Sequence, residues 1–270
     1  MPVSNFLEST HQIGGATRTG ALIVNADDWG RHHETTERIA ECVLCRTVSS
    51  VSAMVFMEDS ERSAAIARER GIDAGLHLNL TTTFSGSGCA RRLVERQKEV
   101  AAYLSRHRLA QAIFNPSLRR SFEYVVKAQL DEFGRLYGAK PDRIDGHHHM
   151  HLCANVLMQR LLPSGTIVRR NFSLQLGEKG VLNRLYRKVV DKRLARRHCL
   201  TEFFFSLPPL EPQSRLERIL SLAHEFTVEV ETHPVNSEEY RFLTGNGIER
   251  WIGDFPIAPG FAIPREGRER

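Results

Sequence analysis

The sequence predicts an α/β fold of about seven strands, most of them joined by helices. Short apolar runs such as residues 21–26 (ALIVNA) are typical of strands buried on both faces. Segments with apolar residues at helical spacing lie between these runs, and this strand–helix–strand order favours parallel βαβ units. An open doubly wound sheet and a closed or distorted β/α barrel both fit the order, and the spacing leaves both open.

The first part of the chain contains the clearest alternation of elements. A strand is predicted at 21–26 because this run is apolar and ends in the polar turn DDWG. A helix is predicted at 34–46, where apolar residues recur at helical spacing, and a strand of small and β-branched residues follows at 48–56. A second helix is predicted at 59–70 and a third strand at 73–80.

The rest of the chain is less regular at first. A Gly/Ser-rich loop is expected at 85–88, and residues 121–137 have the periodicity of an amphipathic helix. Four more strands are expected at 143–145, 166–169, 202–206 and 226–231. The helices between them are expected to end near residue 162 and to cover 178–197 and 214–224.

Length and composition fit one large globular domain or two small ones. The 270 residues are 41% hydrophobic and 26% charged, which is ordinary for a globular chain. A loose N-terminal leader is expected at 1–20, a single β/α domain at 21–250 and an irregular tail at 251–270. The leader lacks the pattern of a signal peptide, no run is long and apolar enough for a membrane helix, and the five cysteines are scattered. These features favour the cytoplasm and no disulfide framework.

The charge balance argues against some partners. Lys and Arg number 37 against 32 Asp and Glu, and a net charge of +5 is mild for a nucleic-acid-binding protein. Residues 160–197 contain 11 basic residues but only two acidic ones, Glu178 and Asp191. Two interpretations stay open: a solvated helix face, or a surface that attracts an anionic substrate or the headgroups of a membrane in peripheral contact. No phosphate-binding glycine motif supports a nucleotide cofactor.

Polar residues follow four of the predicted strands. They are Asp27 and Asp28 after the first strand, His77 in the third, Asp145 with the following histidine tract, and His233. Ligands and catalytic groups gather at the carboxyl ends of strands in β/α folds. Taken singly, the carboxylates also fit an Asx turn or helix N-cap, and His77 also fits a hydrogen-bonded interior residue. Their shared placement favours a common site.

The tract His147, His148, His149 and His151 favours a metal site. In an extended chain His147, His149 and His151 would share one face. Imidazole suits several divalent transition metals, and an added carboxylate would give a two-His, one-Asp site with open positions, as in catalytic metal centres. A solvated histidine-rich loop is the alternative. Adjacent aspartates point in different directions, so one could bind metal while the other faces substrate.

Four motifs resemble the YdjC-like carbohydrate deacetylases, the family that includes chitooligosaccharide deacetylases and a hopanoid-associated branch. They are LIVNADDWG (22–30), GLHLNLT (75–81), IDGHHHMH (144–151) and THP (232–234). The resemblance implies a distorted (β/α) TIM-like barrel that hydrolyses the N-acetyl group of an amino sugar or glycan with one divalent metal ion, Mg or Zn. It also implies that Asp28, His77 and His147 bind the metal, Asp27 is the catalytic base and His233 the acid.

The sequence departs from the family pattern in places that concern the substrate. Trp29 stands where Phe is common, and Glu231-Thr232 where Met-Cys is frequent. Segments 81–120 and 170–215 match weakly, so the sugar and its chain length stay open, as does a homo-oligomer.

His149 and His151 compete with His147 as ligands, Asp145 is expected to orient an imidazole, and Arg169 to contact substrate. A hydrolase of another amide or of a phosphoester, and an inactive metal- or glycan-binding protein, are the alternatives.

Overall fold

The computed structural model describes residues 20–106, 109–174 and 180–261. All but one residue of the expected leader, and residues 262–270 of the expected tail, lie outside these ranges. The strands are β1 Ala21–Trp29, β2 Ser50–Ala53, β3 Ala74–Leu78, β4 Arg143–Gly146, β5 Ile167–Val168, β6 Phe203–Ser206 and β7 Thr227–Thr232. The α-helices are α1 His33–Leu44, α2 Ser60–Arg70, α3 Arg91–Ser105, α4 Arg119–Tyr137, α5 Ala154–Gln159, α6 Val181–Leu194, α7 Gln213–Ala223, α8 Ser237–Thr244 and α9 Asn246–Ile252.

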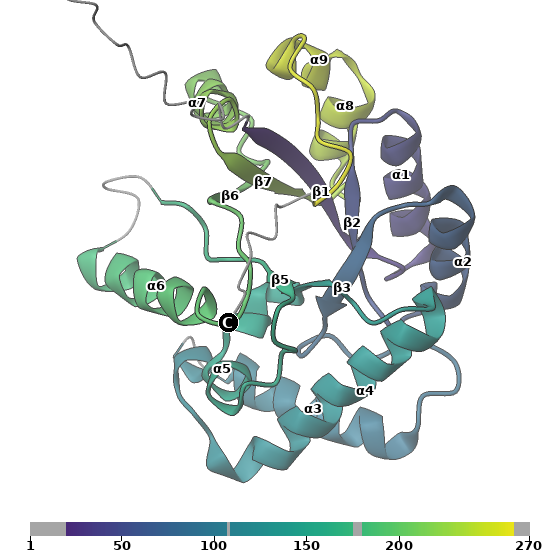
Figure 1. Ribbon diagram of the computed structural model, residues 1–270. Coiled ribbons are helices and arrows are strands. Elements are labelled where there is room, and N and C mark those ends of the chain that lie inside the picture. Colours follow the sequence, from purple (N-terminus) through teal and green to yellow (C-terminus); the bar gives the residue numbers. More distant parts are fainter. Residues whose placement is uncertain (1–19, 107–108, 175–179, 262–270) are drawn as a thin grey trace, which may run out of the picture.

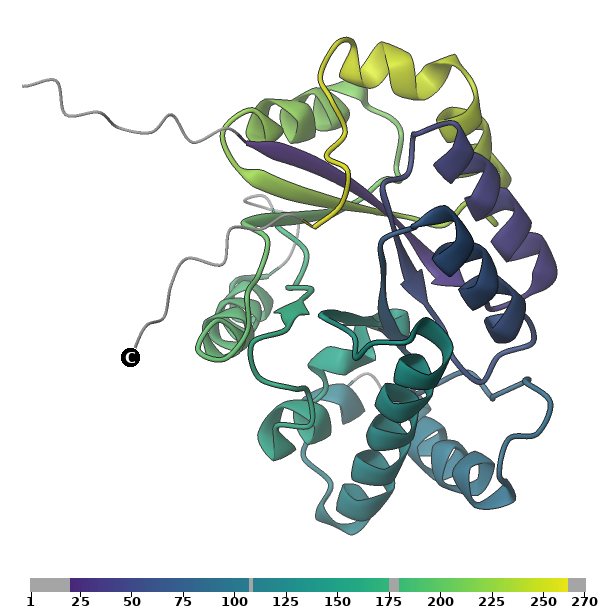
Figure 2. The same ribbon diagram turned by 45° about the vertical axis from the view of Figure 1, so that its right-hand side comes forward.

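The seven described strands form one parallel sheet in the order β5-β4-β3-β2-β1-β7-β6. The sheet curls strongly, and the helices lie along its outside (Figures 1 and 2). Its two edges are linked, since Val168 N donates to Cys199 O at 2.9 Å and Ser173 N donates to Phe204 O at 2.8 Å. The chain is therefore an α/β protein with a curled half-barrel, consistent with the predicted distorted TIM-like barrel.

The centre of the sheet is buried on both faces. β1 pairs with β2 on one side and β7 on the other. Leu22 and Val24 on one face and Ile23 and Asn25 on the other are all buried. Strands covered on both faces are apolar without alternation, which explains the run that predicted this strand. Helix α4 buries Phe122 and Val125 in the same core.

The C-terminal part that the structure describes packs on this domain. Trp251, expected to begin an irregular tail, belongs to α9 and is buried, and its indole Nε1 donates to Leu216 O at 2.7 Å. Ile257 forms a bridge to Leu22 of β1. No helix in the described ranges is long and apolar enough to cross a membrane.

Candidate functional site

An irregularity at the end of β1 brings two neighbouring carboxylates to one imidazole. The β1–β2 register shifts between Ala26 and Trp29, and Asp28 has a left-handed φ of 69°. Side chains in a regular strand alternate between faces, so this distortion is needed for both carboxylates to approach His77. Asp28 Oδ1 lies 3.4 Å from His77 Nε2, and Asp27 Oδ2 lies 3.9 Å from His77 Nδ1. A non-glycine residue with positive φ is strained, and such strain is common at functional sites.

The histidine tract, η3 His147–Leu152, is a tightly turned segment with a kink at His148 and His149, and not an extended one. His148 and His149 both have positive φ, 54° and 57°, which turns successive rings in different directions. Gly146 precedes the turn, and a Cβ there would lie 2.9 Å from the ring of His151. The prediction that His147, His149 and His151 share a face is therefore wrong.

The four rings of the tract have separate surroundings. His147 Nδ1 lies 3.0 Å from Asp28 Oδ1, whereas His148 Nδ1 lies 3.0 Å from the hydroxyl of Thr81. The ring of His149 packs edge-on against Phe172. His151 is buried, with its Nε2 2.9 Å from the backbone oxygen of Arg169. Of the four, His147 is the one that the structure brings to Asp28.

Asp28, His77 and His147 could together hold a metal ion. All three are buried, and their ligand atoms lie within 4.8 Å of one another. Asp28 Oδ1, His77 Nε2 and His147 Nε2 have no hydrogen-bond partner among the described residues. Buried polar atoms normally have partners, so these unused lone pairs fit a bound cation.

The charges around these residues also fit a cation. Burial acts to lower the pKa of His77, but the charge of Asp27, the hydrogen bond to Asp145 and the nearby carboxylate of Asp28 raise it to about 10. Burial opposes ionisation of Asp28, yet the two imidazoles hold the pKa of its carboxyl far below the ordinary value. The site therefore attracts positive charge, which a metal ion could supply in place of a proton.

Asp145 fixes the ring of His77. Its Oδ1 lies 2.6 Å from His77 Nδ1, which leaves Nε2 facing Asp28. Its Oδ2 accepts a hydrogen bond of 2.5 Å from the Ser52 hydroxyl. A carboxylate on the far nitrogen of a metal-binding histidine is a common arrangement, because it sets the tautomer and the ring orientation.

Arg169 lies inside the protein, where carboxylates surround its guanidinium, and its contact with substrate stays a prediction. Its guanidinium binds both oxygens of Asp27, at 2.6 and 2.8 Å, and it is buried. It also pairs with three further carboxylates: Asp145 at 3.2 Å, Glu229 at 2.6 Å and Glu231 at 3.2 Å. Asp27, His77 and Asp145 form a second group with metal-ligand spacing, but both carboxylates of that group are already paired with this guanidinium.

The two glutamates of β7, Glu229 and Glu231, were not predicted from the sequence to be part of the site. Burial raises the pKa of Glu229, and burial together with the charge of Asp27 raises that of Glu231 well above the ordinary value. For Asp27 itself, burial is outweighed by the charges of Arg169 and His77, which lower its pKa. A signal existed in the segment TVEVET, where glutamates alternate with buried valines.

His233 lies at the rim of the site. It follows β7, its side chain is 34% exposed, and its Nε2 lies 3.9 Å from Asp27 Oδ2. Its backbone N–H donates to Glu239 Oε2 at 2.8 Å, and the Thr232 hydroxyl donates to the same oxygen at 2.7 Å. These two bonds hold the segment that carries the imidazole over Asp27.

A hollow of about 240 Å³ adjoins the histidine tract. It is lined by His148 and His149 of η3 and by Tyr186 and Arg187 of α6. Four other basic residues of 160–197 do not line this hollow. Arg160, Arg193, Arg196 and Arg197 line a separate hollow, near the edge of the sheet where β5 begins.

Comparisons with known proteins give the family. The profile of the YdjC-like protein family matches residues 21–252. A carbohydrate deacetylase of Mus musculus is 31% identical over 140 residues, which cover 50% of this chain and 44% of that protein. A chitooligosaccharide deacetylase of Serratia marcescens is 34% identical over 132 residues, 48% of this chain and 50% of that protein. This chain thus spans about half the length of these relatives.

One further relative and one solved structure match longer parts of the chain. A chitooligosaccharide deacetylase of Proteus mirabilis is 27% identical over 198 residues, 65% of this chain and 76% of that protein. The crystal structure of a putative cellobiose-phosphate cleavage protein from Enterococcus faecalis superposes with a TM-score of 0.63. It covers 88% of this chain and 96% of its own at 19% identity, which supports the fold alone. The family predicted from the four motifs is confirmed: the chain belongs to the YdjC-like proteins.

Proposed function

We propose that the protein is a metal-dependent carbohydrate deacetylase that hydrolyses the N-acetyl group of an amino sugar. The observation that carries this proposal is the buried group Asp28, His77 and His147, whose unused lone pairs lie beside the ionised Asp27. The names of the relatives, carbohydrate deacetylase and chitooligosaccharide deacetylase, support the reaction class.

In this proposal Asp28, His77 and His147 hold one divalent ion, Mg or Zn. When bound, such an ion supplies a Lewis acid that polarises the acetyl carbonyl and the attacking water. Asp145 keeps His77 Nδ1 engaged, so that Nε2 stays directed at the ion site.

Asp27 acts as the general base. Its carboxylate accepts a proton from the water that attacks the acetyl carbonyl. The bidentate pair with Arg169 holds it ionised and fixes its orientation. Arg169 is a positioning residue in this proposal, because it acts on the reaction through the two oxygens of Asp27 that it holds.

His233 acts as the general acid. Its partly exposed ring at the rim is within reach of a sugar that enters from solvent, and its Nε2 lies near Asp27. A protonated imidazole there donates to the departing amine, since an amine leaves as a neutral molecule far more readily than as an anion. Acid–base catalysis of this kind contributes about 10²–10⁴-fold in rate.

The test is acetate release from N-acetylglucosamine and its chitooligosaccharides, with and without a chelator. We expect release that the chelator stops and that re-addition of a divalent metal restores. Phosphate release from sugar phosphates without acetate would indicate a phosphoester hydrolase instead. Binding of metal and glycan without any turnover would indicate an inactive binding protein.

We also propose a cytoplasmic location. All five cysteines are unpaired, which suits a reducing compartment. Fractionation of cells that produce the protein, with markers for each compartment, would test this assignment.

A further inference from the structure

Helix α6 presents an apolar face to solvent. Of its side chains, Val181 is 71% exposed, Leu182 83%, Leu185 57% and Val189 59%. Their spacing places them together on one side of the helix, turned away from the side that carries the buried residues Val190 and Leu194. With Tyr186, these exposed residues make up five of the 11 large hydrophobic residues that are exposed in the described ranges. Exposed apolar residues gathered in this way mark an interaction surface.

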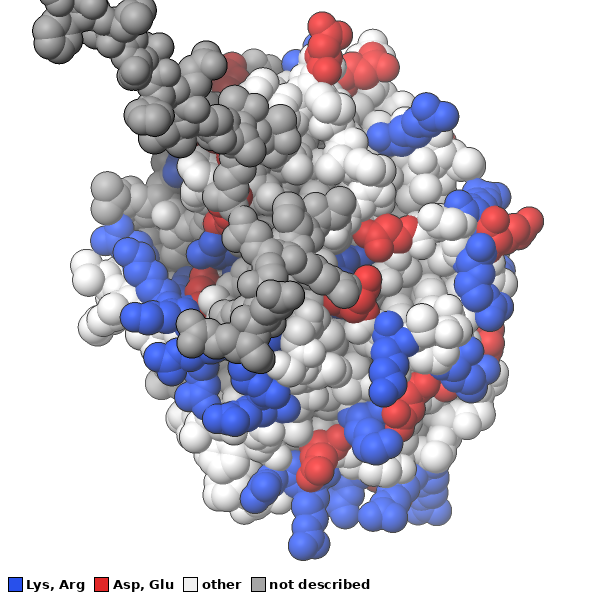
Figure 3. Space-filling view, viewed as in Figure 1, with Lys and Arg blue, Asp and Glu red and all other residues white. Residues whose placement is uncertain are grey.

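Basic residues lie alongside this apolar face. Arg184, Lys188 and Lys192 follow one another at intervals of four residues, and Arg193 lies at the C-terminal end. The acidic residue of the helix, Asp191, is engaged with other residues, since its carboxylate accepts from Asn171 N at 3.0 Å and pairs with Arg170 at 3.1 Å. In Figure 3 the flank over α6 shows Lys and Arg beside uncharged surface.

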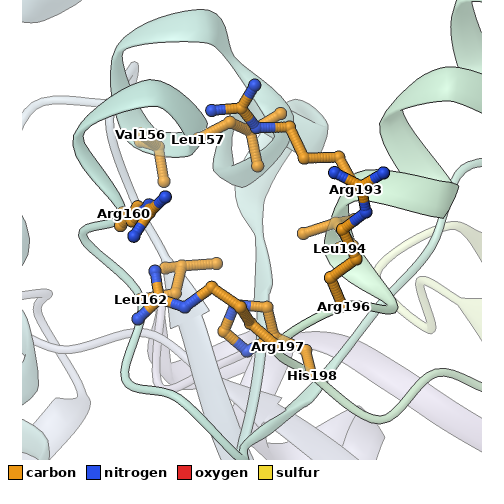
Figure 4. A pocket seen from close by; sticks show the side chains of 9 residues that line it. All are labelled: Val156, Leu157, Arg160, Leu162, Arg193, Leu194, Arg196, Arg197 and His198. Atoms are coloured by element: carbon orange, nitrogen blue, oxygen red, sulfur yellow. The ribbon is translucent and has the colours of Figure 1, made fainter.

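An arginine-rich hollow adjoins the end of this face. It has a volume of about 450 Å³ and lies between α5 and the C-terminal end of α6 (Figure 4). Its described lining includes Arg160, Arg193, Arg196 and Arg197 with His198, and it contains no Asp or Glu. Guanidinium groups bind phosphate oxygens with two parallel hydrogen bonds, so this lining suits a phosphate group.

We propose that the outward face of α6 docks on an anionic lipid bilayer, with the arginine-rich hollow beside it receiving lipid phosphates. A helix with apolar residues on one face and Lys and Arg along its flanks is typical of segments that lie in the membrane interface. Leu182 and Leu185 would enter the headgroup region, and Lys188 and Lys192 would meet anionic lipids.

Charge argues against a second copy of the chain as the occupant. A symmetric dimer through α6 would place the same basic residues of both copies against each other, whereas an anionic bilayer neutralises them. The inner side of α6 also lines the hollow beside the histidine tract, through Tyr186 and Arg187. Docking would therefore hold that hollow close to the membrane. The proposal does not depend on the deacetylase activity.

The test is co-sedimentation of the full chain with vesicles of phosphatidylcholine alone or mixed with phosphatidylglycerol. We expect binding to the anionic vesicles that weakens as salt is raised, because screening shortens the range of the attraction. The double variant Leu182→Gln/Leu185→Gln should bind about tenfold more weakly. Lys188→Gln/Lys192→Gln should lose about fivefold for each charge removed.

Matched controls are Leu44→Gln, at an exposed leucine of α1, and Lys98→Gln/Lys140→Gln, at two exposed lysines away from α6. All five proteins should have the same circular dichroism spectrum, and the control variants should bind as the unaltered chain does. Equal binding by the α6 variants and the controls would overturn the proposal. Failure of the unaltered chain to bind anionic vesicles would also overturn it. If that chain is instead a dimer in solution that Leu182→Gln/Leu185→Gln dissociates, the α6 face is an interface between two copies and the proposal is wrong.

Discussion

Arg169 and Asp27 are joined by two hydrogen bonds, 2.6 and 2.8 Å long, in the interior of the protein. One residue comes from the chain just after β5 and the other from β1, so the pair connects distant parts of the sheet across its interior. The same guanidinium also pairs with carboxylates of β4 and β7. It is thus both a structural element of the half-barrel and the group that holds Asp27 ionised beside the metal-ligand group.

Arg169→Gln should destabilise the protein strongly. Removal of one partner of a buried ion pair leaves unpaired charge and costs about 3–5 kcal/mol. At about 2–4 °C per kcal/mol for a domain of this size, the melting temperature should fall by roughly 10 °C. Arg91→Gln is the control, because Arg91 is 92% exposed in its pair with Glu95. Thermal unfolding of both variants measures the difference, and equal melting temperatures would contradict the structural role of Arg169.

Asp27→Asn and Asp28→Asn should have different effects on metal and turnover. Asp28 Oδ1 faces the rings of both His77 and His147, whereas both oxygens of Asp27 are held by Arg169. We expect Asp28→Asn to lose the metal, and Asp27→Asn to abolish acetate release while keeping the metal. Elemental analysis of both purified variants provides the measurement. Equal loss of metal from the two would refute this division of roles.

Asp145→Asn should weaken metal binding without removing a ligand. The carboxylate of Asp145 sets the ring of His77 through a contact of 2.6 Å, and loss of such a partner typically costs 10–100-fold in metal affinity. Ser52→Ala is the matched control, because Ser52 contacts the other oxygen of Asp145 and leaves the contact with His77 in place. Titration of metal-free protein with a competing chelator gives both affinities. An affinity in Asp145→Asn as high as in Ser52→Ala would count against the orienting role.

The sheet could be predicted from the sequence because its strands are buried on both faces. Burial of this kind leaves apolar runs that are visible without any knowledge of the partners, as at residues 21–26. Runs also showed where the strands end, and hence that the polar residues near those ends would share one edge of the sheet. Only the resemblance to the family singled out Asp28, His77 and His147 among them, and the structure brings these three together. The apolar runs did not predict how far the sheet curls round on itself. That depends on contacts between its two edges, such as Ser173 with Phe204, and no sequence pattern marks those contacts.

The conformation of the histidine tract could not be predicted, because it depends on tertiary contacts. An extended chain was the natural expectation after a strand, but the backbone at His148 and His149 enters the left-handed region. The tight fit of Gly146 against His151 becomes visible only once the tract is folded. The position of Arg169 was hidden for a similar reason, since its four carboxylates come from three strands far apart in the sequence.

His233→Gln should slow hydrolysis of an amide much more than hydrolysis of an activated ester. An amine needs a proton to depart, and general acid catalysis contributes about 10²–10⁴-fold, whereas 4-nitrophenolate departs from 4-nitrophenyl acetate without protonation. The imidazole lies at the rim and outside the metal-ligand group, so the variant should keep its metal content and its melting temperature. Rates of acetate release from N-acetylglucosamine oligomers and from 4-nitrophenyl acetate, each compared with those of the unaltered protein, separate proton donation from other roles. A similar loss on both substrates would mean that His233 positions the acetyl group, and full activity on the amide would remove it from the mechanism.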